Sequence, residues 1–187
     1  MRRIFVALAI LLALGNTAEA KNYITLESPS GNTIVDETGK WILGPYKDLH
    51  VNYIIDFGER YAYASFYDNS QKRYINLNTM AYLPSGYDYE FSYEYAKALT
   101  KDGFKLVKSD GTYAINDVVS AYYYCSDNLI FGKKGEFWYL YNISTSSLVI
   151  DNPITSTYEN VNKYYNGSGQ VALLKIETAD GYIKYVT

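Results

Sequence analysis

Apolar and polar side chains alternate along most of the chain after residue 20, and Gly, Asn, Asp, Ser and Pro interrupt the alternation at short intervals. Residues 87–95 are the clearest case, with Tyr or Phe at every odd position and a polar residue at every even one. An extended strand points successive side chains to opposite faces, so this segment predicts a strand with one aromatic face. Residues 90–99 are the strongest rival for a helix, but the aromatic alternation outweighs them. The pattern predicts an all-β protein.

The alternating segments recur as hairpins, each made of a strand, a turn of small or charged residues, and a returning strand. Five such hairpins can be superimposed, and they begin at Tyr23, Tyr61, Tyr95, Asn128 and Gln170. After each of the first four come a polar turn, a four-residue strand, a break at Gly, Pro or Asn, and a Tyr-rich stretch. The unit returns every ~33–42 residues, which lies in the range of repeat architectures.

One such unit cannot bury its own apolar face, whereas stacked neighbours can bury a continuous one. The sequence therefore predicts tandem β-hairpin repeats that form an open curved or superhelical sheet. Closure of the same units into a small five-bladed β-propeller is the alternative, because each unit is long enough for three or four strands. Residues 21–187 are predicted to be a single β-repeat domain of about five hairpin units.

The order of these features resembles the WG (KWG) repeats, which occur mainly in bacterial proteins of largely unassigned function. Residues 42–46, and residues 82–84 followed by Tyr87, match the connector of that repeat. Residues 74–76 and 181–183 match its returning strand, although the Trp-Gly dipeptide itself does not occur. The resemblance covers most of residues 34–186. It implies a bacterial repeat protein, and the family brings no catalytic residues with it.

The first twenty residues have the layout of a secretory signal peptide. Arg2 and Arg3 precede an apolar run at residues 4–14, and a small-x-small site ends at Ala20. The run is shorter than the ~20 residues that a bilayer span needs, which disfavours the alternative of an uncleaved anchor. We expect cleavage after Ala20 and a secreted, periplasmic or outer-surface protein, with no integral membrane segment after cleavage.

Composition excludes several chemistries. The net charge of −3 and the lack of a long basic run argue against a nucleic-acid partner. Cys125 is the single cysteine, so no intramolecular disulfide is available, and we expect it to be a small buried hydrophobe. His50 is the single histidine, which disfavours a catalytic triad and a transition-metal site. Asp110, Asn116 and Asp117 are the nearest approach to a calcium loop, but turn capping explains them better. We expect no cofactor, no metal and no catalytic residue.

The excess of aromatic residues remains, with 23 tyrosines in the chain. Exposed Trp and Tyr faces bind sugar rings, although most strand aromatics pack against neighbours. In residues 122–124, alternation sends the middle tyrosine to the face opposite its two neighbours, so a one-sided sheet would expose some of them. The candidate ligand-binding residues are Trp41, Tyr122, Tyr123, Tyr124, Trp138, Tyr164 and Tyr165, with Tyr87 and Tyr89 as further aromatic candidates.

These observations favour an exported, non-enzymatic repeat protein that binds a cell-envelope polysaccharide or a surface protein. The first alternative is a purely structural or adaptor module whose aromatic residues are all core. The second is a small secreted hydrolase, which would need two carboxylates ~5–10 Å apart in a cleft. The sequence leaves the ligand and the oligomeric state open.

Overall fold

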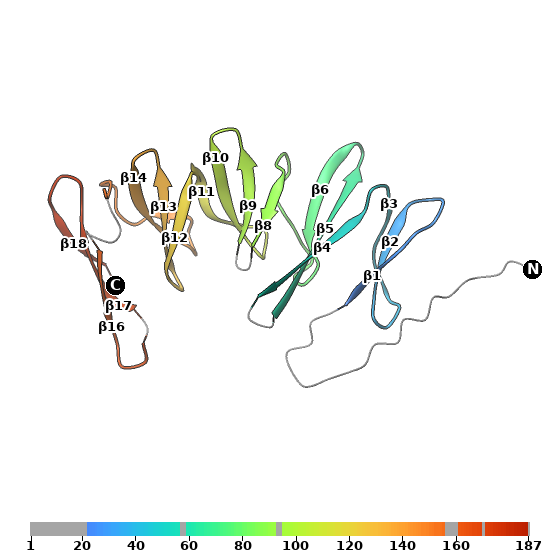
Figure 1. Cartoon of the computed structure of the whole chain (residues 1–187), viewed down its shortest axis with the longest axis horizontal. Coiled ribbons are helices and arrows are strands. Elements are labelled where there is room, and N and C mark those ends of the chain that lie inside the picture. The colour runs from blue at the N-terminus through green and yellow to red at the C-terminus, as the bar shows by residue number, and fades with distance from the viewer. Residues whose placement is uncertain (1–21, 57–58, 93–94, 156–160, 170, 187) are drawn as a thin grey trace, which may run out of the picture.

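The structure is a computed structural model that describes residues 22–56, 59–92, 95–155, 161–169 and 171–186. Within these residues the chain forms strands and turns and no helix. The strands make five small antiparallel sheets, which we name sheets A to E in chain order. Figure 1 shows the sheets standing in one row, with sheet A (blue) and sheet E (red) at opposite ends.

Each sheet is a meander, because its hydrogen-bonded neighbours are consecutive in the chain. Sheet A comprises β1 (Tyr23–Leu26), β2 (Asn32–Asp36) and β3 (Trp41–Tyr46). Sheet B comprises β4 (His50–Asp56), β5 (Glu59–Asp68), β6 (Gln71–Asn76) and β7 (Ala81–Tyr82). Sheet C comprises β8 (Tyr89–Phe91), β9 (Tyr95–Thr100), β10 (Gly103–Lys108) and β11 (Tyr113–Val119). Sheet D comprises β12 (Ala121–Ser126), β13 (Leu129–Lys134), β14 (Phe137–Asn142) and β15 (Ser147–Leu148). Sheet E comprises β16 (Val161–Tyr165), β17 (Val171–Glu177) and β18 (Ile183–Val186).

The turn residues explain where the hairpins reverse. Between β5 and β6, Asp68 pairs with Gln71, so the loop has only two residues, Asn69 and Ser70. Both have positive φ, at 47° and 65°, as the tight hairpin turn that matches strand twist requires. Gly103, the first residue of β10, has φ 150° and lies so close to Val119 that an added Cβ would be 2.4 Å from the carbonyl oxygen of Val119. Glycine is therefore required at this position.

The apolar side chains form four layers, one between each pair of neighbouring sheets. The A–B layer contains Tyr23, Ile34, Leu43, Leu49, Ala62, Ala64, Phe66, Ile75 and Leu77. The B–C layer contains Tyr63, Tyr74, Leu83, Ala96, Ala98 and Val107. The C–D layer contains Tyr95, Leu106, Ala114, Ile115, Val119, Ile130, Tyr141 and Ile143. The D–E layer contains Cys125, Leu129, Phe131, Leu140, Ile150, Ile154, Leu174 and Ile176.

Strand alternation supplies both faces of the middle sheets. In β5, Ala62 and Ala64 face sheet A, while Tyr63 between them faces sheet C. In β13, Ile130 faces sheet C and Phe131 faces sheet E. Each of these side chains is almost completely buried. Sheets B, C and D are therefore sandwiched on both sides, and each sheet contacts the next one along the row.

The prediction of an all-β, open array of tandem hairpins is confirmed, and the row does not close into a ring (Figure 1). The sheets are hydrogen-bonded separately, so the array is a stack of small sheets. The single cysteine, Cys125, is buried as predicted, and burial raises the pKa of its thiol. The described residues include no helix that could cross a membrane. The predicted signal peptide at residues 1–20 lies outside the described residues.

Candidate functional site

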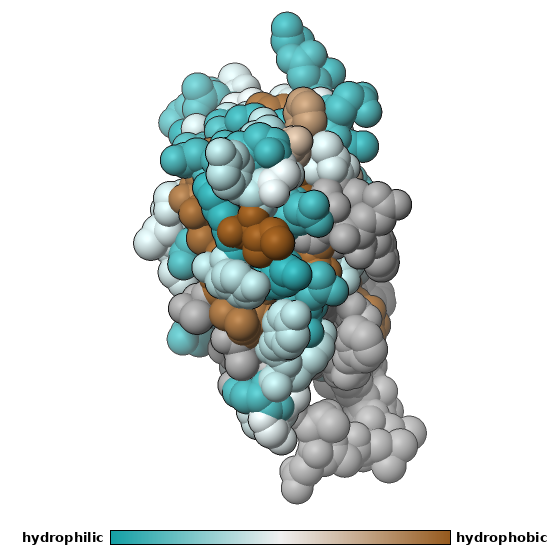
Figure 2. Space-filling model, turned by 90° about the vertical axis from the view of Figure 1, so that its left-hand side faces the viewer, coloured by the Kyte–Doolittle hydropathy of each residue, from teal (hydrophilic) through white to brown (hydrophobic). Residues whose placement is uncertain are grey.

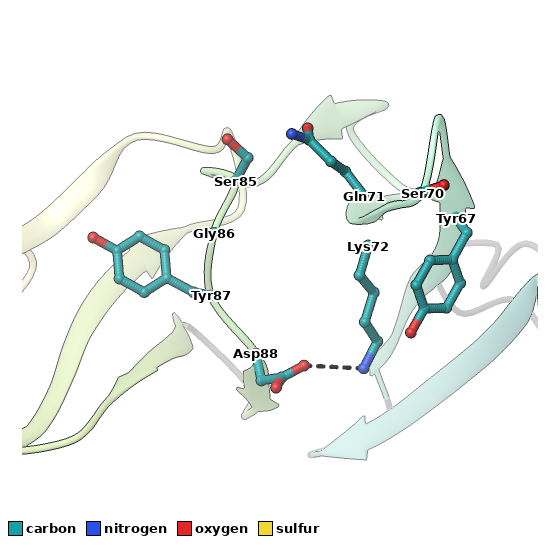
Figure 3. Close-up of a pocket in the computed structure, with 8 residues that line it drawn as sticks. All are labelled: Tyr67, Ser70, Gln71, Lys72, Ser85, Gly86, Tyr87 and Asp88. Atoms are coloured by element: carbon teal, nitrogen blue, oxygen red, sulfur yellow. Dashed lines mark hydrogen bonds and ion pairs between the residues drawn. The ribbon is translucent and has the colours of Figure 1, made fainter.

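A groove of about 540 Å³ lies where sheet B meets sheet C, at the edge formed by the β5–β6 turn. One wall is the end of the β5–β6 hairpin and the other is the segment that leads into β8 (Figure 3). We call it the B–C groove. Its lining residues are Tyr67, Ser70, Gln71, Lys72, Ser85, Gly86, Tyr87 and Asp88.

Two local features build the walls of the groove. The two-residue turn at Asn69 and Ser70 brings Tyr67 and Lys72 into adjacent, cross-strand paired positions. On the opposite wall, Gly86 has φ 88°, which lets the chain turn after Pro84 and run back along sheet C. The backbone NH of Leu99 in β9 then donates to the carbonyl oxygen of Asp88 at 2.8 Å, which fixes the second wall.

An ion pair joins the two walls. Lys72 Nζ lies 3.0 Å from Asp88 Oδ1, and Figure 3 shows the two side chains meeting across the groove. The hydroxyl of Tyr74 donates to the same Oδ1 at 2.9 Å. The hydrogen bonds that Asp88 accepts from Lys72 and Tyr74 lower its pKa, and the hydrogen bonds that Lys72 donates to Tyr74 and Asp88 raise the pKa of the ammonium group. Both groups are therefore charged at neutral pH, and the second carboxylate oxygen, Oδ2, keeps its capacity to accept.

The aromatic surface of the groove comes from Tyr67. Its side chain is 44% exposed, at the end of β5. Tyr87 also lines the groove, but in Figure 3 its ring turns away from Lys72. That ring packs edge-to-face on Tyr89, with ring centroids 6.5 Å apart, and Lys105 Nζ lies 5.9 Å from its centroid. One aromatic face is thus available beside a set of amide, hydroxyl, ammonium and carboxylate groups.

A second hollow, of about 510 Å³, adjoins the groove on the other side of the same turn. We call it the A–B hollow, and it lies where sheet A meets sheet B. Its lining residues are Ser30, Pro45, Tyr46, Lys47, Asp48, Tyr67, Asp68, Asn69 and Ser70. Tyr67 and Ser70 line both sites. The β5–β6 turn is therefore a shared wall between two polar hollows in successive gaps of the array.

Three of the predicted ligand-binding residues belong to the core layers. Tyr122 packs in the C–D layer, edge-to-face on Tyr95 and Phe104 at 6.2 and 6.1 Å between centroids. Tyr123 packs in the D–E layer against Phe131, and Trp138 packs in the same layer. Alternation does place Tyr123 opposite its neighbours, as predicted. The assumption of a one-sided sheet was wrong, because sheet E covers the second face of sheet D.

The other four predicted residues are exposed but do not form one site. Trp41 is 61% exposed in sheet A, whereas Tyr164 and Tyr165 are exposed in sheet E at the opposite end of the row. Tyr124 is exposed in sheet D, and its hydroxyl donates to Asp127 Oδ1 at 3.1 Å. Asp127 and Tyr165 line a further hollow of about 490 Å³, which we call the D–E hollow. Tyr164 and Tyr165 are neighbours in β16, and the fold brings Tyr124 of sheet D near Tyr165 through Asp127.

Of the residues that line the B–C groove, the sequence singles out Tyr87 alone, as one of its further aromatic candidates. The sequence does predict a turn at residues 68–72 and a break at residues 84–86, each as a connection within its own repeat. Nothing in the local pattern states that these two connections lie side by side. The available signal was the repeat itself, because equivalent turns of successive units fall on one edge when the units stack.

The oxygen-bearing residues considered for calcium have partners within the chain. Asp110 Oδ1 accepts from the backbone NH and the hydroxyl of Thr112, at 2.9 and 2.6 Å, which is turn capping as predicted. Asn116 accepts from Lys105 Nζ at 2.9 Å, and Asp117 accepts from Lys134 Nζ at 3.0 Å. Among the described residues there is no group of three or more His, Cys, Asp or Glu side chains that could hold a metal ion.

No protein-family model matches the chain. No curated protein gives a significant match either. Among solved structures the chain is similar to the crystal structure of HIRA(644-1017), with 8% sequence identity and a TM-score of 0.28. That similarity covers 90% of this chain and 52% of the other, so the chain spans about half the length of the structure it matches. A likeness this distant carries no information about ligand or activity.

Proposed function

We propose that the chain is an exported, non-enzymatic binding module for a cell-envelope glycan, and that the B–C groove is its binding site. The observation that carries the proposal is the exposed ring of Tyr67 beside the Lys72–Asp88 ion pair and Gln71. An aromatic face and a small number of placed polar groups are what a carbohydrate site needs. Two expectations from the sequence support the proposal. The predicted signal peptide favours export, and the resemblance to WG repeats favours a repeat protein without catalytic residues.

The groups of the groove suit the chemistry of a sugar ring. The apolar face of a pyranose would stack on Tyr67, since a tyrosine ring supplies a large apolar surface at little entropic cost. Its hydroxyls would meet a carboxylate oxygen of Asp88, the amide of Gln71 and the remaining protons of Lys72, which together offer both donors and acceptors. The bridged ion pair holds these groups in place before the ligand arrives.

The two adjoining hollows favour a polymeric ligand. The B–C groove and the A–B hollow share Tyr67 and Ser70, so a polysaccharide that leaves one of them would enter the other. A single sugar would fill one site, whereas an oligosaccharide could span both and gain affinity from the linkage. A repetitive glycan therefore fits this edge of the array better than a monosaccharide does.

The single acid of the B–C groove supports a binding role. Asp88 is the only carboxylate among its lining residues, and its lowered pKa makes it a poor proton donor at neutral pH. Two carboxylates, Asp48 and Asp68, line the A–B hollow. The alternative of a carboxylate-dependent hydrolase is therefore one outcome that the experiment has to separate from binding.

The test is a binding measurement with immobilised chain and a fractionated envelope, with each fraction examined before and after protease treatment. We expect capture of a protease-resistant glycan by the unaltered chain. Tyr67→Ala should weaken that capture roughly tenfold or more, because removing an aromatic stacking face costs about 1.5 kcal/mol. The amount of free reducing ends should stay constant during incubation.

Two tyrosines provide matched controls. Tyr182→Ala removes an exposed ring that lines none of the three hollows, and it should leave capture unchanged. Tyr165→Ala removes the exposed ring of the D–E hollow. If that variant loses capture and Tyr67→Ala does not, the site has been misassigned. Loss of capture on protease treatment would indicate an adaptor for a surface protein, and a rise in reducing ends would indicate a hydrolase.

A further inference from the structure

The outward face of sheet E carries exposed apolar and aromatic side chains beside Lys175 and Glu177, and no other described part of the chain covers it. In β18, Val186 packs towards sheet D in the D–E layer, so the neighbouring Tyr185 and Ile183 point to the opposite side. Tyr185 is 62% exposed, and Tyr164 of β16 lies half-exposed on the same side. Figure 2 looks at this end of the molecule and shows apolar residues in the middle of the face, with hydrophilic residues around them.

The outward face of sheet A is apolar as well. Ile24 of β1 pairs with Val35 of β2, and Val35 pairs with Trp41 of β3, so the three share one face. Leu26 lies on that face too, and Ile34 lies on the opposite face, in the A–B layer. Ile24 and Leu26 are about half exposed. Terminal units of repeat arrays usually carry a polar outer face, whereas the two sheets at the ends of the described row carry exposed apolar side chains.

In each of the four internal layers, one sheet packs its forward face against the backward face of the next sheet. The outward faces of sheets E and A are a forward face and a backward face of the same kind. Ile24 and Leu26 lie on the side of sheet A that corresponds to Ala62 and Ala64 in sheet B, which are buried against the preceding sheet. Tyr185 lies on the side of sheet E that corresponds to Leu140 in sheet D, which is buried against the following sheet. Sheet E therefore offers a forward face and sheet A a backward face, and the two are complementary in kind.

We propose that copies of this chain associate head to tail, with the outward face of sheet E on one copy packed against the outward face of sheet A on the next. The occupant of each face is a second copy, because the new contact continues the sheet-on-sheet stacking of the four internal layers. It is a heterologous contact, and since the row of sheets does not close, it extends into a chain of copies. Lys175, which pairs with Tyr185 in sheet E, would face Trp41 of the next copy. Lys163 of sheet E already makes a cation–π contact of this kind inside the molecule, because its Nζ lies 4.7 Å from the ring centroid of Tyr123 in sheet D.

The test is sedimentation velocity on the full chain over a range of concentrations, with no glycan present. We expect species larger than a dimer to grow with concentration. Ile24→Glu and Tyr185→Glu should each raise the dissociation constant by roughly a hundredfold, because each would place a carboxylate in the contact and association would have to remove its water. Met80→Glu, on an exposed turn of sheet B, is the matched control and should not change association. Circular dichroism should show that all three variants remain folded.

Mixing the two face variants distinguishes head-to-tail contact from a symmetric dimer. Ile24→Glu keeps an intact sheet E face and Tyr185→Glu keeps an intact sheet A face, so an equimolar mixture should form dimers and nothing larger. If Tyr185→Glu alone still dimerises, or Ile24→Glu alone does, the contact is symmetric and the proposal is wrong. A wild-type chain that stays monomeric at every concentration also overturns it. Neither result depends on the proposed glycan site.

Discussion

Truncation of Phe131 should release one end of the array and leave the other end folded. The side chain is fully buried in the D–E layer, where Tyr123 packs against it with ring centroids 6.3 Å apart. Phe131→Ala in a core of this kind costs about 3–5 kcal/mol, from lost transfer free energy and the cavity left behind. In the described residues, sheet E is covered by this layer alone. The cost should therefore fall mainly on the docking of sheet E.

Hydrogen exchange measured by mass spectrometry can locate that cost. Peptides from β17 and β18 should exchange a hundred- to a few-thousand-fold faster in Phe131→Ala, which is about 3–5 kcal/mol expressed as a ratio. Peptides from β5 and β6 should change little, because stability in repeat proteins is a sum of nearest-neighbour terms. Phe66→Ala in the A–B layer is the mirror control and should loosen sheet A. If every sheet exchanges faster by the same factor in Phe131→Ala, the array folds as one unit and the reasoning fails.

Two further predictions concern the contacts that hold neighbouring strands and sheets. Burial would raise the pKa of Asp117, but hydrogen bonds from Lys134 and a tyrosine lower it below its ordinary value, so the carboxylate stabilises the fold above about pH 4. This contribution should be lost as pH falls through the lower, folded pKa. The urea-unfolding difference between wild type and Asp117→Asn should therefore be flat above about pH 5 and shrink below about pH 4, by less than about 1 kcal/mol since the pair is partly exposed. A difference that grows on acidification would contradict this. Gly103→Ala should lower the free energy of unfolding by more than about 1 kcal/mol, because the Cβ of the alanine would meet the carbonyl oxygen of Val119. Gly39→Ala, with φ 81° and open space around it, should cost clearly less in the same urea titration.

The hairpins could be predicted because their determinants are local. Turn residues such as Asn69-Ser70 tolerate positive φ, and period-two alternation sets the strands between them. The prediction of one strand over residues 87–95 was wrong, because β8 covers only Tyr89–Phe91 and Tyr95 begins β9, which runs back antiparallel to β8. Tyr87, Tyr89 and Phe91 do share one face in the B–C layer, whereas Tyr95 packs in the C–D layer. The four predicted connecting strands are present as β3, β7, β11 and β15, but their predicted length of four residues was wrong, since β7 and β15 have 2 residues each, β3 has 6 and β11 has 7.

The candidate site could not be predicted, because it depends on how repeats meet. Tyr122 and Tyr123 were selected for their alternation, which is correct, but alternation does not reveal whether the second face of a sheet is covered. The sequence does not single out Tyr67, because an exposed aromatic residue at the end of a strand has no distinctive sequence pattern. Tyr67 is a candidate binding residue because it lies beside Lys72 and Asp88, and these two are brought together by the packing of one repeat against the next.

The stacking of the sheets decides where this chain can bind anything. In the middle sheets both faces are covered, so a tyrosine in the interior of a strand there is largely taken up by packing, as Tyr63 and Tyr141 are. Only the turn edges and the two end faces remain for partners. The edges carry turn residues, which are polar because tight turns require them, and so they suit a hydroxyl-rich ligand. The end faces carry strand residues, which are apolar because the repeat requires them, and so they suit another sheet of the same kind. A glycan along the edge and a second copy at each end would therefore use separate surfaces, and the occupancy of one should leave the affinity of the other unchanged.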